Sequence, residues 1–422
     1  MGEGDEGSIK PIARNARPLR SFDLLAIWFG AGISIAEFWA GALLVPGVSL
    51  LQALLLIVLG HAIGNSLMGL VSMEGYDVGV PTMVLTRKAL GEKGSYLPSA
   101  LNYMQLIGWT AVMNIVGGKA LDTVFVSLGY ASNLKIWIAV MGMLNTLWAL
   151  AGPRKWKWLE RTSAILLLIL VVWLTAVTLE SVKEIDWSRG SSGLPLLQAL
   201  DLVVAMPVSW LPLVADYSRL SSGAPFLSTF LGYFASSGLF YFVGGLTNSY
   251  LGMSDPISII AAYGLGIPAL LVIILSTTTT TFMDIYSAAI SFKNIRPEEP
   301  IWRQILLVGS AGLVLALLFP MEEYQWFLLI IGGAFVPLAT IMIVDYYLVS
   351  KRRYDAEELI GGKLPKARKT GISSWAIGFA VYMLISIYAP QIGSTIPSMI
   401  ATGALYYAMS TLFERRIRVK MY

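Results

Sequence analysis

Four ionisable residues lie inside long apolar segments of the sequence, namely Glu37, Lys119, Asp201 and Asp284. On insertion scales such a residue at the bilayer centre costs about 2.5–3.5 kcal/mol, so each one requires a reason. Lys119 precedes Asp122 by three positions, which favours an ion pair within one helix. Asp201 lies near the outer end of its segment, within reach of water, which favours a structural role. Glu37 and Asp284 have no basic neighbour in their own segments, so they are candidates to bind substrate or carry a proton.

A run of six hydroxyl residues, Ser276–Thr281, precedes Asp284 in the same apolar segment. One or two of these hydroxyls can bond back to the preceding helical turn, but six exceed that need. Two adjacent hydroxyls, a carbonyl one turn earlier and carbonyls of an unwound neighbouring helix would supply about five neutral oxygens. Such a set suits a desolvated monovalent cation such as sodium.

Gln105 and Trp109 lie one helical turn apart on the same face of another apolar segment. An indole face stacks on flat heteroaromatic rings, and an amide reads the donors and acceptors of a ring edge. Trp210 is a candidate second wall. The alternative is an interfacial role, because the chain has 13 Trp and most tryptophans in membrane proteins occupy interfacial belts. His61 is interpreted as a neutral packed histidine in preference to a proton carrier.

The composition indicates which elements must position these residues. Of the 422 residues, 56% are hydrophobic and 13% are charged. Soluble domains carry about 25% charged residues, so the chain is predicted to be an all-α integral membrane protein. With no cysteine and one histidine, disulfides and histidine- or thiolate-based catalysis are not expected. Twelve membrane segments are predicted, with limits near 22–46, 49–73, 97–127, 133–151, 160–180, 195–217, 226–250, 266–292, 303–320, 324–349, 373–389 and 393–413.

The distribution of positive charge predicts the orientation. With the N-terminus in the cytoplasm, inward tails and loops hold 26 of the 30 Lys and Arg residues, and outward loops hold Lys135, Lys183 and Arg189. The positive-inside rule therefore predicts that both termini are cytoplasmic in the cell membrane. It also explains the basic pI without nucleic acid as a partner. No apolar core precedes Arg20, so we expect no cleaved signal peptide.

Two segments carry helix-breaking residues in matching places. The first contains Gly30 and Gly32 near its middle, and the sixth contains Pro207 and Pro212. Transporters built from inverted repeats place their substrate between two such discontinuous helices. The break positions therefore favour a five-plus-five inverted repeat with two peripheral helices. The alternative is that these Gly and Pro residues serve packing only.

At these residues the chain resembles the nucleobase:cation symporter-1 family. The resemblance spans nearly the whole chain and is carried by Leu24–Gly30, Gly79–Arg87, Gly91–Pro98, Gly108–Trp109, Asp216–Arg219 and Asp345–Tyr347. Within the family it is most similar to the branch of hydroxymethylpyrimidine transporters, through Ile35–Glu37, Gly60–Gly64, Leu101–Met113 and Thr281–Ser287.

The resemblance implies the leucine-transporter fold and a set of site residues. The domains expected are a tail at 1–21, a ten-helix core at 22–349, a basic loop at 350–372, two peripheral helices at 373–413 and a tail at 414–422. The implied sodium ligands are Gly30, Ile33, Ser276, Thr279 and Thr280. The substrate-binding residues expected are Trp109, Gln105, Ser34, Glu37, Ser209, Trp210, Thr281 and Asp284.

This sequence departs from the family pattern at several of these positions. Met113 replaces a Gln that binds substrate in some members, so Gln105 is expected to take over that work. Thr281 and Asp284 stand near the place of absent Asn residues, and Glu37 is acidic where many members are neutral. An acid facing an aminopyrimidine is chemically sensible, because it accepts from the exocyclic amine.

The function predicted is secondary active import of a pyrimidine, hydroxymethylpyrimidine first, by symport with sodium and optionally protons. One alternative is a permease for cytosine, another nucleobase or an allantoin-type compound, and a second is an amino-acid carrier of the same fold. A membrane enzyme or a receptor is the alternative of a different class. No catalytic constellation is visible in the sequence, so no enzyme is predicted.

Overall fold

The computed structural model describes residues 9–151, 153–180, 185–188, 190, 193–264, 266–318 and 323–420, without the side chains of 153–161 and 413–420. The described part is helical, and its only strand-like pairing is one bridge between Leu19 and Ser221. The helices longer than eight residues are α1 (Ser21–Ala31), α2 (Ile35–Leu44), α3 (Leu50–Val78), α4 (Thr82–Leu90), α5 (Tyr96–Ser127), α6 (Leu134–Leu150), α7 (Pro153–Glu180), α8 (Leu196–Trp210), α10 (Phe226–Leu251), α12 (Gly266–Lys293), α13 (Ile301–Leu318), α14 (Tyr324–Ile343), α16 (Lys369–Tyr388) and α17 (Thr395–Lys420). The short helices are η1 (Arg14–Ala16), η3 (Leu211–Leu213), α9 (Val214–Ser218), α11 (Pro256–Ala262), η5 (Val344–Val349), α15 (Ala356–Ile360) and η6 (Pro390–Ile392).

The predicted membrane segments are all helical. Among the described residues, eight helices are long and apolar enough to span a bilayer, and the bent pair α1 and α2 adds a ninth span. Helices α5, α6 and α17 occupy the other three predicted segments. The prediction of an all-α, multi-pass membrane protein is confirmed.

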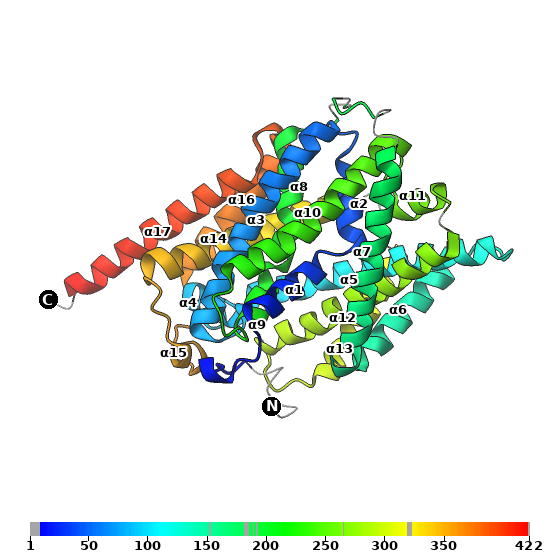
Figure 1. Ribbon diagram of the computed structural model, residues 1–422. Coiled ribbons are helices and arrows are strands. Elements are labelled where there is room, and N and C mark those ends of the chain that lie inside the picture. Colours follow the sequence, from blue (N-terminus) through cyan, green and yellow to red (C-terminus); the bar gives the residue numbers. More distant parts are fainter. Residues whose placement is uncertain are drawn as a thin grey trace.

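Helix packing follows the symmetry of an inverted repeat (Figure 1). The first span, α1 with α2, packs on the seventh, α10, and the second span, α3, packs on the sixth, α8. The third span, α5, packs along the eighth, α12, and the fourth, α6, along the ninth, α13. If each span of the first five is exchanged with the span five places later, the same pairs of spans result. Two five-helix repeats related by symmetry require this pattern. Helices α16 and α17 pack on each other and on α14 at one side of this core.

The first span is broken, whereas the sixth is not broken in the way predicted. Helices α1 and α2 meet at a bend of 57°. Pro207 lies inside α8, and the chain then continues through η3 and α9 in one span without a comparable bend. The physical reason is that Pro212 falls at the start of the tighter 3₁₀ turn, where its missing N–H is tolerated.

Two of the ionisable residues have other partners than the sequence predicted. Lys119 forms its ion pair with Asp255, at 3.2 Å, and not with Asp122 on its own helix. Asp201 is buried, not in reach of water, and its carboxylate accepts hydrogen bonds from the backbone N–H groups of Ser394 at 2.6 Å and Thr395 at 2.9 Å. These donors are at the N-terminus of α17, so the predicted structural role of Asp201 is to fix that helix to the core.

Two short helices outside the predicted membrane segments, α4 and α15, gather with α9 at one end of the bundle. Helices α4, α9 and α15 lie near the N-terminus (Figure 1), and α4 contacts both of the others. Arg87 of α4 is buried and donates to Asn294 Oδ1 at 3.0 Å and to the Leu359 carbonyl at 3.1 Å. The Arg87 guanidinium therefore links α4 to the residue that follows α12 and to α15.

Candidate functional site

The break in the first span places backbone polar groups at the centre of the molecule. Helix α1 ends at Ala31 and α2 begins at Ile35, with Ser34 capping α2 by accepting from the Ala36 N–H at 3.2 Å. A helix end leaves carbonyls without helical partners, and Ile33 precedes the cap residue, outside the hydrogen-bond ladder of α2. The junction thus exposes backbone oxygens that an unbroken helix would use itself.

Glycines hold α2 against α10 at backbone contact. A Cβ atom at Gly41 would overlap the Tyr241 carbonyl oxygen, and one at Gly244 would overlap the Phe38 carbonyl oxygen. Small residues at such crossings allow helices in a membrane to approach closely. This approach brings Glu37 of α2 next to the polar side chains of α10.

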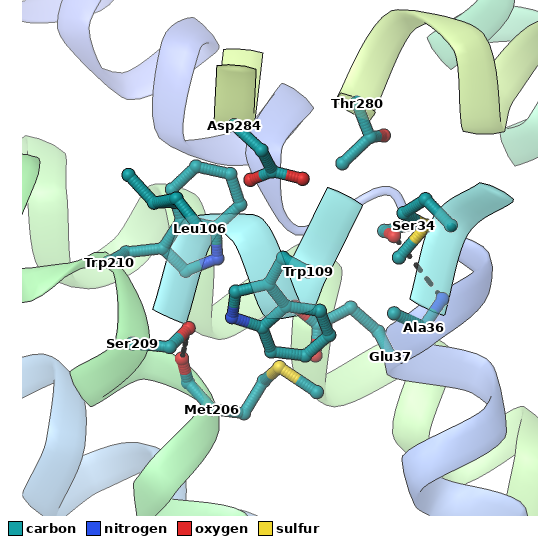
Figure 2. A pocket seen from close by; sticks show the side chains of 11 residues that line it. Ser34, Ala36, Glu37, Leu106, Trp109, Met206, Ser209, Trp210, Thr280 and Asp284 are labelled. Atoms are coloured by element: carbon teal, nitrogen blue, oxygen red, sulfur yellow. Dashed lines mark hydrogen bonds between the residues drawn. The ribbon is translucent and has the colours of Figure 1, made fainter. Parts of the chain in front are cut away.

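A central cavity of about 360 Å³, counted with its part open to solvent, lies beside the junction (Figure 2). Trp109 and Trp210 line it, and the Trp109 ring is held edge-on by Tyr324 at 6.0 Å and Phe327 at 5.2 Å between ring centroids. The complete lining is Ser34, Ala36, Glu37, Leu106, Trp109, Met113, Met206, Ser209, Trp210, Thr280 and Asp284.

Both predicted intramembrane acids line this cavity. Tyr233 donates a hydrogen bond to Glu37 Oε1, and Ser237 donates one to Glu37 Oε2 at 2.8 Å. Asp284 is buried, and its Oδ2 has no hydrogen-bond partner in the described part of the chain. A buried carboxyl oxygen without a partner is costly, so a donor from a bound solute would relieve that cost.

Two predicted substrate ligands do not line the cavity. The Gln105 amide donates to Asn102 Oδ1 at 2.7 Å and to the Ser209 carbonyl at 2.8 Å. That carbonyl has no donor three residues later because Pro212 lacks an N–H. The Thr281 hydroxyl donates back to the Thr277 carbonyl at 2.5 Å. The arrangement therefore uses Gln105 to support the wall of the cavity.

The lining also contains residues that were not among the predicted substrate ligands. Thr280 appears there although it was assigned to the ion site, and Met113 appears there at a position identified by its departure from the family pattern. Ala36, Leu106 and Met206 are apolar, and no sequence signal separates them from residues of the packed core.

A second cavity brings together all five predicted sodium ligands. Gly30 and Ile33 come from the end of α1 and the junction, and Ser276, Thr279 and Thr280 come from α12. The hydroxyls of Thr279 and Thr280 both donate to the Ser276 carbonyl, at 2.9 and 3.1 Å. Each hydroxyl oxygen keeps lone pairs for a cation. These groups are neutral oxygens of the kind that a desolvated sodium ion needs.

The two cavities share part of their walls. Trp210 and Thr280 line both of them. A multi-pass helical protein with a broken span, a buried aromatic cavity and an adjoining set of neutral oxygens has the architecture of a cation-coupled secondary transporter.

Comparison with known proteins gives the family. The family described as "Permease for cytosine/purines, uracil, thiamine, allantoin" matches residues 11–408. The chain is 27% identical to the cytosine permease of Escherichia coli strain K12 over 363 residues, 84% of each chain. It is 23% identical to the hydantoin permease of Microbacterium maritypicum over 412 residues, 90% of this chain and 84% of that protein. The chain belongs to this family, the nucleobase:cation symporter-1 family, as the resemblance predicted.

Solved structures show the same fold. The inward-facing conformation of Mhp1 superposes with a TM-score of 0.84 at 20% identity, covering 96% of this chain and 93% of that one. The closed conformation of Mhp1 with bromovinylhydantoin bound gives 0.82 at 21% identity, covering 96% and 95%. The fold prediction is confirmed. The chain is a transporter and not an enzyme, a cation-coupled permease for a nucleobase or related compound.

Proposed function

We propose that this permease imports a pyrimidine that carries an exocyclic amine, with hydroxymethylpyrimidine as the first candidate. The observation that carries the proposal is that the Trp109 indole and the carboxyl groups of Glu37 and Asp284 line one buried cavity. An indole stacks on a flat ring, and a carboxylate accepts from an amine or a ring N–H. An amino acid would not require this combination of a stacking wall and two acids.

We also propose that sodium binds between α1 and α12 and couples to the substrate. The five oxygens named above supply its ligands, and the C-terminal end of α1 carries the negative end of the helix dipole. Because Thr280 and Trp210 border both cavities, an ion that orders these residues also orders the substrate wall. Rocking of the two repeats around the loaded site would then expose it to the other side.

Uptake by purified protein in proteoliposomes tests the proposal. We expect labelled hydroxymethylpyrimidine to accumulate under an inward sodium gradient and not under an equal potassium gradient. Unlabelled uracil, which lacks the exocyclic amine, should compete poorly. Stronger competition by cytosine than by hydroxymethylpyrimidine would favour the cytosine permease alternative. Uptake of amino acids without uptake of any pyrimidine would refute the proposed substrate class.

A further inference from the structure

Three side chains from three helices form a continuous hydrogen-bonded line that starts at the substrate cavity. Ser237 Oγ of α10 is 2.8 Å from Glu37 Oε2 of α2 and 2.6 Å from His61 Nε2 of α3. His61 Nδ1 is 2.9 Å from the Ile57 carbonyl oxygen. All three side chains are buried, and His61 is fully so. His61 is therefore bonded on both ring nitrogens.

Counting hydrogens along this line shows that it is one short when Glu37 is ionised and His61 is neutral. A carbonyl only accepts, so Nδ1 of His61 carries a hydrogen, and in the neutral ring Nε2 must then accept. An ionised Glu37 only accepts as well. Ser237 has one hydrogen, yet both of its short contacts would need it. One contact would be left with two lone pairs facing each other in a buried site, which is costly.

One additional proton satisfies every contact, and it has two places, which give either a carboxylic acid beside a neutral ring or a carboxylate beside an imidazolium. On Glu37, the carboxylic acid donates to Ser237 Oγ and the Ser237 hydroxyl donates to His61 Nε2. On His61, Nε2–H donates to Ser237 Oγ and the Ser237 hydroxyl donates to Glu37. The two forms interconvert when Glu37 gives its proton to Ser237 Oγ while Ser237 passes its own hydrogen to His61 Nε2. No atom other than these hydrogens changes its bonds.

We infer that Glu37, Ser237 and His61 form one proton-binding site, and that the permease carries a proton inward together with its substrate. Glu37 lines the substrate cavity, whereas His61 lies behind Ser237, so the proton reaches the site through Glu37 from that cavity. A cavity that opens alternately to the two sides loads and releases such a proton with the substrate.

The residues that the structure describes around Glu37 provide no cationic side chain, so a proton is the means of neutralising its carboxylate. Tyr233 and Tyr241 of α10 and Tyr324 of α14 are the titratable groups packed around Glu37, and Asp284 of α12 shares its cavity. Helix α8 presents the non-titratable residues Leu200, Val203, Val204 and Pro207 to the glycines that flank His61. None of the ion pairs among the described residues includes Glu37 or His61. A buried carboxylate without a paired cation is strongly disfavoured.

The inference rests on the proposed function for its substrate, because an exocyclic amine at Glu37 favours the carboxylate form. Binding of that amine would therefore draw the proton from Glu37 onto His61. A glutamine substitution can imitate each of the two protonated forms without an ionisable group. In His61→Gln the amide donates to Ser237 without an ionisable ring, and in Glu37→Gln the amide replaces the carboxylic acid.

The first test measures proton entry into proteoliposomes that contain a trapped pH-sensitive dye, with equal sodium on both sides. Adding hydroxymethylpyrimidine outside should acidify the interior for the unaltered chain. His61→Gln and Glu37→Gln should abolish this acidification, with His61→Gln still binding substrate, and Ser237→Ala should abolish it by breaking the line. Ser236→Ala is the matched control, since that hydroxyl donates only to the Gly232 and Tyr233 carbonyls, and it should acidify normally. Acidification that persists in His61→Gln overturns the inference.

The second test needs no substrate. Because the chain has a single histidine, ¹⁵N-histidine labelling gives ring signals that belong to His61 alone. We expect the Nε2 signal to change across roughly pH 5 to 9 and to stop changing in Glu37→Gln. A ring signal that is constant throughout, together with pyrimidine uptake without proton entry, would remove the inference and leave the proposed function. If His61 titrates but the protein takes up no pyrimidine, the proton-binding site would stand and the proposed substrate would be wrong.

Discussion

At the scale of single residues, Trp109 is the side chain on which substrate affinity should depend most. Its ring is buried and held edge-on by two aromatic neighbours, with the indole at the cavity. Loss of base stacking costs about 1–3 kcal/mol, so Trp109→Ala should weaken the substrate Kd by roughly fivefold to 150-fold. Equilibrium binding to detergent-solubilised protein measures this change.

The control for that substitution is a tryptophan outside the cavity. Trp137 stacks on Phe125 with ring centroids 4.0 Å apart, and it does not line the cavity, so Trp137→Ala should leave the Kd unchanged. An unaltered Kd in a folded Trp109→Ala protein would show that the ring does not stack there.

The residue scale also shows what the sequence can and cannot predict. Glu37 and Asp284 could be identified from this sequence alone because charged residues are rare inside membrane segments. Trp109 could be identified because it lies near the middle of its segment, one turn from Gln105. The partners of Glu37 were not, because Tyr233 and Ser237 are ordinary residues whose role depends on α10 lying against α2. Gln105 was assigned to the substrate for its residue type, and in the structure its amide donates to the Ser209 carbonyl.

At the scale of elements, the contact of α1 with α12 should determine the response to sodium. Thr280→Ala removes one of the five proposed ligands, so half-maximal uptake should require a sodium concentration about tenfold higher. The matched control is Thr278→Ala, because the Thr278 hydroxyl bonds back to Ile274 at 2.8 Å and lines neither cavity. A sodium dependence that is the same in both variants would place the ion elsewhere.

A second prediction at this scale concerns the attachment of α17 to the core. Asp201→Ala leaves the N–H groups of Ser394 and Thr395 without their acceptor. Loss of a helix cap costs about 0.5–2 kcal/mol, so the expected result is a lower Tm in detergent with an unchanged substrate Kd. Asp201→Asn keeps one acceptor oxygen and should lower the Tm less. A lower affinity at an unchanged Tm would contradict a purely structural role.

Element boundaries depended on how specific the local signal was. The break of the first span follows from Gly30 and Gly32 with a capping Ser34, and the structure has it there. Two prolines in the sixth segment gave a similar signal, but a proline at the start of a 3₁₀ turn needs no break. The sequence carries the proline positions, but it does not show that the chain continues from α8 through a 3₁₀ turn into α9 within one span.

At the scale of the whole molecule, the fold was predictable because the bilayer restricts the choices. Apolar segments of about 20 residues must be helices there, so their number follows from counting. The break positions indicated a repeat, and the helix packing supports it, because exchanging the two sets of five helices converts the pair of spans one and seven into the pair of spans six and two. The short helices α4 and α15 lie outside the apolar segments, and the hydropathy that revealed the spans gives no signal for them.

The orientation of the whole molecule is a prediction that the absence of cysteine makes easy to test. Cysteines introduced singly at exposed positions react with a membrane-impermeant maleimide only from the side that they face. Ala131→Cys, between α5 and α6, should be labelled in intact cells, and Lys363→Cys, in the basic loop before α16, only after permeabilisation. The reason is that 26 positive charges stay on the cytoplasmic side by the positive-inside rule. The reverse labelling pattern would show that the topology is the inverse of the one predicted.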